Sequence, residues 1–142
     1  MIVLDSDHLS VFEYPEADQA VQLRERLRLS SDRDIYTTAV SLEEQMRGWL
    51  AAIHRRQDVR LQVTCYSRLV DLVRFYANWR ILPFDDQAAK EFQRLRRERV
   101  RIGTMDLKIA SIALINDAML LSANLRDFEQ VPGLRAEDWI GE

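Results

Sequence analysis

The residues with the clearest chemical potential are four carboxylates that lie far apart in the chain but occupy equivalent places in the predicted elements. One ends a predicted strand, two lie in the first turn of a predicted helix, and one lies in the loop after a predicted strand. They are Asp5, Glu44, Asp106 and Asp127. In a parallel α/β sheet, the carboxyl ends of the strands and the starts of the following helices share one edge, where ligands bind. The four carboxylates can therefore converge on one site.

Carboxylates placed together repel one another, so such a cluster normally holds a cation. Oxygen ligands with no cysteine and no nearby histidine favour Mg²⁺, with Mn²⁺ as the alternative, over Zn²⁺. A water on such an ion becomes a nucleophile once its pKa is lowered, and a phosphodiester is a natural target. No Ser-His-Asp or Cys-His set can be assembled from His8, His54 and Cys65. The pattern indicates metal-dependent hydrolysis.

Each acid also has a purely structural explanation. Acids in a first turn complement the helix dipole, which covers Glu44 and Asp106, and Asp127 can cap a turn. Asp5 is harder to explain in this way, because a carboxylate directly after a buried apolar strand is costly without a partner. The equivalent places of all four favour a functional site.

The elements that must position these acids alternate between strands and helices. Apolar or β-branched runs predict strands at residues 2–4, 35–38, 81–82 and 119–121. Helical spacing predicts helices after Asp7, from Pro15 to about Leu29, from Ser41 onward, from about Leu61 to Trp79, from Asp85 or Asp86 to about Arg99, and from Asp106 to Asn116. Ser41 is predicted to be an N-cap because Glu44 follows three residues later. Residues 122–133 are expected to be loop and turn.

This alternation predicts a helix-rich, three-layer α/β/α fold with a central parallel sheet. The 142 residues suit a single domain, 1–142. Glycine and proline are scarce, with 4 and 3 residues, which argues against an all-β sandwich. Hydrophobic residues make up 47% and charged residues 30%, so the composition is that of a folded chain.

The single cysteine and the N-terminus bear on the compartment. Cys65 cannot form an intramolecular disulfide, and it lies in an apolar run, where we expect a core residue. The start MIVLDSDH lacks the basic and long apolar segments of a signal peptide. Charges interrupt every apolar run before it reaches the length of a membrane span. We therefore expect a cytoplasmic protein without a membrane partner.

The chain resembles a known family in four short motifs. Leu4 to His8, LDSDH, resembles the opening motif of PIN domains, with Ser6 in place of the usual Thr. TTAVSLEEQMRG resembles the second motif and selects Glu44 as its acid. GTMDLKIA, from Gly103, resembles the third motif, and SANLRDFEQVPGL, from Ser122, resembles the fourth. The motifs stand in order and at family-like spacing over essentially the whole chain.

The resemblance implies a PIN fold and a Mg²⁺-dependent endoribonuclease, usually a VapC-type toxin with a cognate antitoxin and a homodimer. On this reading Asp5, Glu44, Asp106 and Asp127 hold the metal, while Ser6 and Asn124 orient the carboxylates and water. Glu43 directly precedes Glu44 and is the alternative ligand if the helix begins one residue later.

An acidic site must still attract RNA, although the net charge is −3. On a helix that ends just before Asp106, Arg94, Arg97 and Arg101 share a face that can hold phosphates near the metal, and Arg126 stands beside Asp127. The alternative is a solvated face with acidic partners such as Glu98. The apolar helix 61–79 can supply a dimer face or an antitoxin groove.

Other functions remain open from the sequence. Asp5-Ser6-Asp7 also resembles the D-x-D start of haloacid-dehalogenase phosphatases, but that fold normally needs a longer chain. A PIN domain that binds RNA or a partner without turnover is a second alternative. A housekeeping RNA-processing nuclease without an antitoxin is a third. The RNA target, the cleavage position and the number of metal ions are not indicated by any residue.

Overall fold

The computed structural model describes residues 1–141, and these form a five-stranded, wholly parallel sheet with helices on both faces. The strands are β1 (Ile2–Leu4), β2 (Ile35–Thr38), β3 (Ile81–Leu82), β4 (Met119–Leu121) and β5 (Arg135–Glu137). Their order in the sheet is β3-β2-β1-β4-β5, with each pair parallel. The central strand is therefore β1, which Asp5 follows directly.

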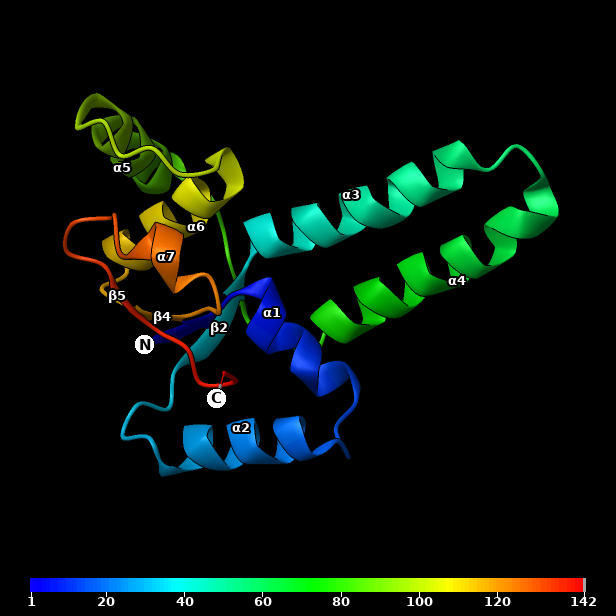
Figure 1. Ribbon diagram of the computed structural model, residues 1–142, viewed down its shortest axis with the longest axis horizontal. Helices are drawn as coiled ribbons and strands as arrows, with labels where there is room; N and C mark the ends of the chain where they lie inside the picture. The colour runs from blue at the N-terminus through cyan, green and yellow to red at the C-terminus, as the bar shows by residue number, and fades with distance from the viewer. Residues whose placement is uncertain (142) are drawn as a thin grey trace.

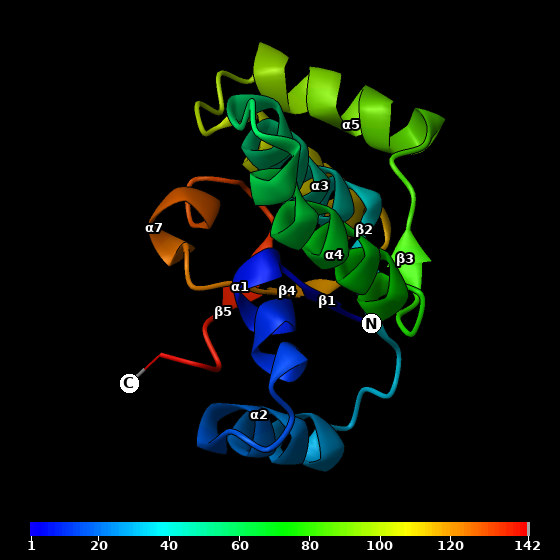
Figure 2. The same cartoon turned by 90° about the vertical axis from the view of Figure 1, so that its right-hand side faces the viewer.

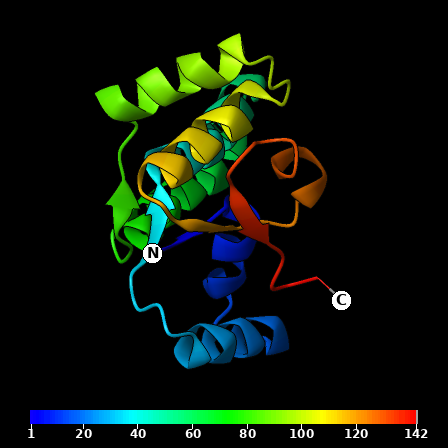
Figure 3. The ribbon, with the colours of Figure 1, turned by 90° about the vertical axis from the view of Figure 1, so that its left-hand side faces the viewer.

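The helices are α1 (Ser6–Leu9), α2 (Asp18–Leu29), α3 (Ala39–Arg55), α4 (Val59–Tyr76), α5 (Asp86–Arg97), α6 (Thr104–Ile115) and α7 (Leu125–Phe128), and the short 3-10 helix η1 (Ser10–Glu13) follows α1. Figure 1 shows the sheet between α5 and α6 on one side and α2 on the other. The long α3–α4 hairpin projects from this body, and in Figure 2 it points toward the viewer. Figure 3 shows β5, in red, beside β4; β5 is the edge strand at the end of the sheet opposite β3.

Both faces of the sheet are buried, which explains why its strands are continuous apolar runs rather than alternating ones. Val3 packs into the core that α5 and α6 cover, while its neighbours Ile2 and Leu4 pack into the core beneath α2 and α4. Successive side chains of a strand point to opposite faces, so one short run serves both cores. The predicted three-layer α/β/α fold is confirmed.

The start of α3 differs from the prediction. The helix begins at Ala39, and its N-cap is Thr38, whose side chain accepts a hydrogen bond from the Ser41 amide at 3.0 Å. Ser41 as N-cap was therefore wrong, because the last residue of β2 itself supplies the capping oxygen and the strand passes directly into the helix. Glu44 consequently lies in the second turn of α3 rather than the first.

Other boundaries shift because of local capping. Asp58 caps α4, which therefore runs from Val59 to Tyr76 instead of from about Leu61 to Trp79. Helix α5 ends at Arg97, and Arg99 adopts a left-handed conformation with φ 64°. The stretch expected as loop after β4 contains α7, and β5 adds a strand that the sequence pattern did not predict.

Helix α6 is the central element of one helical layer, because it is buried from several sides at once. Leu107, Ile109, Ala110, Ile112 and Ala113 are each at most 1% exposed. Helix α5 packs along it, and α3 and β4 also contact it. Within residues 1–141, no helix combines the length and the apolar character needed to cross a membrane.

Truncating a side chain of this core should lower the free energy of unfolding. Ile109→Ala is expected to lower the free energy of unfolding by about 2–5 kcal/mol, because the lost methyl groups leave a cavity under α5 and the sheet. Val21, which is 48% exposed on α2, provides the control, and Val21→Ala should change stability by less than about 0.5 kcal/mol. Urea unfolding followed by circular dichroism measures both. Equal midpoints for the two variants would contradict this account of the core.

Candidate active site

The carboxyl ends of β1 and β4 meet at Asp5. The Asp5 amide donates to the Leu121 carbonyl at 2.9 Å, which joins the residue after β1 to the end of β4. On the other side of β1, the Thr37 hydroxyl donates to the Leu4 carbonyl at 3.1 Å. Three strand ends are thereby held together, and the Asp5 side chain, only 7% exposed, stands among them.

Both carboxylate oxygens of Asp5 accept hydrogen bonds. Oδ1 accepts from the Ser6 amide at 2.8 Å, and Oδ2 accepts from the Ser122 hydroxyl at 2.7 Å. The pKa of Asp5 is nevertheless raised to about 6. Burial is the main cause and the nearby charges of Asp7 and Asp106 add to it, while the two hydrogen bonds oppose the rise. Asp5 is thus a buried carboxylate held in a field of like charge.

Asp106 and Asp127 are linked by one amide group. The side-chain Nδ2 of Asn124 donates to Asp106 Oδ2 and to Asp127 Oδ2, each at 3.0 Å. Asp106 stands in the first turn of α6, and Asp127 lies in α7 rather than in the loop that was expected. Burial raises the pKa of Asp106, and Asp127 and Asp7 add to the rise, whereas Asn124 lowers it. Asn124 therefore occupies the orienting position that the resemblance assigned to it.

Glu44 faces this group of acids. Its side chain is half-buried, and burial raises its pKa, to which Asp5 and Asp106 add by like-charge repulsion. Glu43, the alternative ligand, instead pairs with Arg47 at 2.6 Å, one turn further along α3. This geometry favours Glu44 as the ligand, while Arg47, although paired with Glu43, lies near enough to Glu44 for its charge to lower the pKa of that carboxyl.

Asp7 is a further acid at the site that the sequence reasoning did not select. Burial would raise its pKa, but hydrogen bonds involving His8 and the Ala123 amide together lower it below the ordinary value. Its negative charge contributes to the raised pKa of both Asp5 and Asp106, so it faces the same group. The available signal was the second acid of the D-x-D pattern in LDSDH.

The serine that orients Asp5 is not the one that was expected. Ser6 was assigned this role, but its hydroxyl is buried and has no hydrogen-bond partner among the residues that the structure describes. It lies near the Tyr76 hydroxyl, whose pKa burial raises. Ser122 instead donates to Asp5, because it follows β4 beside the end of β1.

The predicted arginine stripe does not form. Helix α5 ends at Arg97, so Arg101 lies beyond the helix and the three arginines do not share one helical face. Arg94 is engaged by Glu91 and, at 2.7 Å, by Glu98. The alternative of a solvated face with acidic partners therefore describes Arg94. Arg126 is exposed beside Asp127 and remains free to approach a phosphate.

The residues present fit a divalent cation of the Mg²⁺ type. Within residues 1–141, no three His, Cys, Asp or Glu side chains stand close enough together to hold an ion as they are placed. The donor set is nevertheless made of oxygens alone, which suits Mg²⁺ or Mn²⁺. Burial, and to a lesser degree like-charge repulsion, raises the pKa of Asp5, Glu44 and Asp106, and a cation bound between them would offset both effects.

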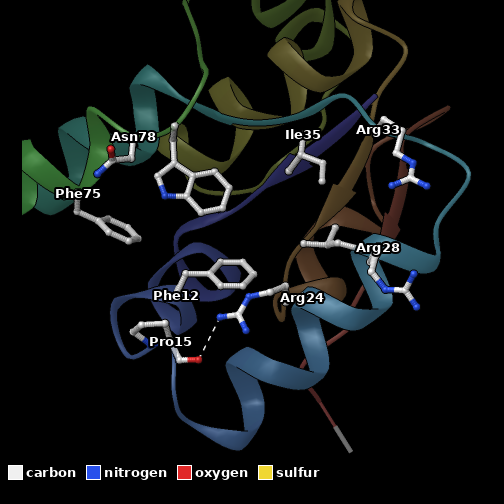
Figure 4. A pocket seen from close by; sticks show the side chains of 10 residues that line it. Phe12, Pro15, Arg24, Arg28, Arg33, Ile35, Phe75 and Asn78 are labelled. Atoms are coloured by element: carbon white, nitrogen blue, oxygen red, sulfur yellow. Dashed lines mark hydrogen bonds between the residues drawn. The ribbon is translucent and has the colours of Figure 1, made fainter.

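A separate cavity of about 650 Å³ lies between α2 and the end of α4, and no carboxylate of the site lines it. Figure 4 shows its aromatic and aliphatic wall, with Phe12, Ile35 and Phe75 facing the space. Arg24, Arg28 and Arg33 line it as well. An apolar wall beside cationic groups suits a protein segment better than a metal or a phosphodiester.

Comparison with known proteins agrees with this architecture. The model of the PIN domain family matches residues 2–134. The chain is 30% identical over 121 residues to the tRNA(fMet)-specific endonuclease VapC of Salmonella typhimurium, covering 82% of this chain and 83% of that protein. It therefore belongs to the PIN-domain family, and its recognition as a VapC-type member is confirmed.

Solved structures show the same fold. VapBC from Salmonella typhimurium, bound to DNA, contains a chain with TM-score 0.70 and 25% identity, over 97% of each chain. VapBC2 from Rickettsia felis, bound to a DNA fragment from its promoter, gives TM-score 0.72 and 24% identity, over 98% of this chain and 99% of that one. The haloacid-dehalogenase alternative is left without support.

The raised pKa of Asp5 makes stability depend on pH. The unfolded chain releases this proton near pH 3.8 and the folded chain near pH 6, so the folded state binds it more tightly. The free energy of unfolding should therefore fall as pH rises from about 4 to about 6. Asp5→Asn should remove this loss of stability at higher pH. It should stabilise the metal-free protein at pH 7.5 by about 1–2 kcal/mol. This gain is smaller than the full pKa shift implies, because the substitution also removes one oxygen acceptor.

Thermal unfolding in EDTA across this pH range measures the effect. Asp34→Asn is the control, because Asp34 is an exposed acid that pairs with Arg80, and its removal should leave the pH dependence intact. A variant at Asp5 that is less stable than wild type at pH 7.5 would show that the cost of burying this charge is not the dominant effect at the residue.

Proposed function

We propose that the protein is a Mg²⁺-dependent endoribonuclease of the VapC type, which hydrolyses RNA phosphodiester bonds with a metal-activated water. The observation that carries the proposal is the convergence of carboxylates at the carboxyl edge of the sheet, where Ser122 bonds to Asp5 and Asn124 bonds to both Asp106 and Asp127. The likeness to a tRNA(fMet)-specific endonuclease supports RNA as the substrate class. Mn²⁺ is the alternative ion.

Asp5, Glu44, Asp106 and Asp127 would hold the ion. When bound, a divalent ion supplies charge neutralisation and lowers the pKa of a coordinated water to make a nucleophile. The chain's own contribution is to keep these oxygens aimed at one place. Ser122 fixes Asp5 from the loop after β4, and Asn124 spaces Asp106 from Asp127 by bonding to both.

RNA is negatively charged, so basic side chains near the site must offset the negative charge of the carboxylates at this edge of the sheet. Arg126 stands exposed on α7 next to Asp127, where it can contact a phosphate that flanks the scissile bond. Arg97 and Arg101 are also exposed, although they are not arranged as one stripe. RNA contact is proposed for these three residues and not for Arg94, which Glu91 and Glu98 engage.

The proposal is tested by the cleavage of total cellular RNA by the purified protein with Mg²⁺ or Mn²⁺, beside an EDTA control. Asp106→Asn should lower cleavage by about 10³-fold or more, because it removes a charged oxygen ligand. Glu44→Gln should also abolish cleavage. Glu43→Gln is the matched control, since Glu43 is its immediate neighbour but pairs with Arg47, and it should retain activity.

Discrete metal-dependent fragments that disappear in Asp106→Asn and Glu44→Gln would support the nuclease, and mapping their ends would identify the target. Loss of activity in Glu43→Gln with retention in Glu44→Gln would overturn the choice of ligand. Absence of cleavage by the wild-type protein from every RNA pool tested would favour a PIN domain that binds without turnover.

A cognate antitoxin is part of the same proposal. The similar solved structures are of VapBC assemblies. The cavity between α2 and the end of α4 supports such a partner, because its aromatic wall and arginines suit an amphipathic segment with apolar and acidic side chains.

The homodimer is retained as a proposal too, and the apolar stripe of α4 supports it. That stripe consists of Val59, Val63, Tyr66, Val70 and Val73, which are 46–71% exposed.

The cavity can be tested by charge reversal. Arg33→Glu, at an exposed residue of the cavity, should weaken co-purification with the product of a neighbouring antitoxin gene by about 10-fold or more, because it places like charges together. Arg60→Glu is the control, since Arg60 is exposed near the tip of the α3–α4 hairpin. Equal capture by both variants would argue that the antitoxin binds elsewhere.

A further inference from the structure

His8 is a buried titratable side chain that the proposed mechanism does not use. It lies on α1, directly after the residues that form the site, and is 0% exposed. A buried polar ring requires partners, because each unpaired nitrogen would carry a desolvation penalty. Both of its nitrogens have one.

The partners of the two ring nitrogens define where the proton is. The backbone amide of Trp139 donates to His8 Nε2 at 2.9 Å, and a backbone amide can only donate. Nε2 is therefore the acceptor, and in the neutral ring the proton lies on Nδ1. Nδ1 stands 2.6 Å from Asp7 Oδ1 and donates to it. Asp138 Oδ1 is more distant from Nε2, at 3.5 Å.

The second oxygen of Asp7 reaches the loop that follows β4. Asp7 Oδ2 accepts from the Ala123 amide at 2.9 Å, and the Ser122 hydroxyl lies 3.4 Å away. The same Ser122 hydroxyl donates to Asp5 and accepts from the Asn124 amide at 3.0 Å. Because both oxygens of Asp7 already have donors, Asp7 is placed to brace this loop rather than to serve as a free ligand.

We propose that His8 is a positioning residue for the active site: it carries a hydrogen-bonded connection from the backbone of Trp139 through Asp7 to residues 122–124, and so holds the groups that orient Asp5, Asp106 and Asp127. The inference rests on the proposed function, since these carboxylates are its metal ligands. The segment after β5 thereby helps to hold the active site in place. Among the motif acids, only Asp127 is near this segment in sequence. Loss of the connection should loosen the loop and weaken metal binding more than it weakens the fold.

The test is the affinity of RNA-free protein for Mn²⁺, measured by calorimetry, together with kcat and KM for RNA and the unfolding midpoint in EDTA. His8→Leu removes both bonds of the ring and should raise the Kd for Mn²⁺ by about 10-fold or more, as is typical when a group supporting a ligand is lost. His8→Asn keeps a short N–H donor for Asp7 and should recover part of the affinity. At matched Mn²⁺ concentration, the loss of activity in His8→Leu should appear as a lower kcat, while the KM for RNA should change little.

His54→Asn is the matched control, because His54 is the other histidine and is exposed on α3. Asp7→Asn covers the case in which His8→Leu fails to fold, since the Asp7 side chain is 34% exposed and its replacement leaves no buried cavity. It should weaken Mn²⁺ binding in the same direction, because one of its two acceptors becomes a donor and because a negative charge near Asp5 and Asp106 is lost.

Folded His8→Leu and Asp7→Asn variants that bind Mn²⁺ and cleave RNA as wild type does would overturn the positioning role while leaving the nuclease intact. A variant that loses affinity only in proportion to a lowered unfolding midpoint would also overturn it, because that is a general effect on stability. Failure of the wild-type protein to bind Mn²⁺ or cleave RNA would count against the proposed function itself.

Discussion

Repulsion among carboxylates at one edge of a parallel sheet is the constraint on which the site depends. Asp5 is almost fully buried, and Asp7 and Asp106 both raise its pKa. Such a group is stable in one place only if uncharged donors hold each side chain and the surrounding fold is rigid. Ser122 and Asn124 supply those donors. The arrangement costs stability in the metal-free chain, which is a common feature of sites that are organised for a cation.

The sheet order explains how residues from such different parts of the chain meet. β1 lies between β2 and β4, so the residue after β1 is adjacent both to the start of α3 and to the loop after β4. Helix α6, packed against this sheet, then brings its own first turn to the same edge. Burial on both faces gives the strands no freedom to slip, because a shift of one residue would expose an apolar set on each side.

The molecule separates its acidic edge from its apolar surfaces. The cavity beside α2 and the exposed stripe of α4 contain none of the site carboxylates. A partner bound to either surface would therefore meet side chains that do not serve the proposed chemistry. The hydrogen-bonded link from Trp139 through His8 to Asp7, in contrast, does reach the site, because it joins the end of the described chain to the residues around Asp5.

The sequence by itself determined the fold class, and it selected the four acids that are proposed as metal ligands, because both depend on local signals. Apolar strand runs such as Ile2–Leu4 predicted the sheet, and a parallel sheet places the ends of its strands on one edge. The motif around Glu44 selected it over Glu43 even though the predicted cap of its helix was wrong, since a helix start can move without changing which side chains share a face.

Only the tertiary structure decided which polar groups touch which acid. Ser122 and Asp5 are separated by 117 positions, and no local pattern indicates that Ser122 rather than Ser6 donates to that carboxylate. The same holds for Asp7 and for the buried ring of His8, whose partners come from the loop after β4 and from the end of the chain. For Arg94 the sequence left two readings open, contact with RNA or pairing with acids such as Glu98, and only the placed side chains show that the ion pairs with Glu91 and Glu98 form. Side-chain hydrogen bonds depend on distance and angle within a fraction of an ångström, and the chain reaches that geometry only when the layers pack.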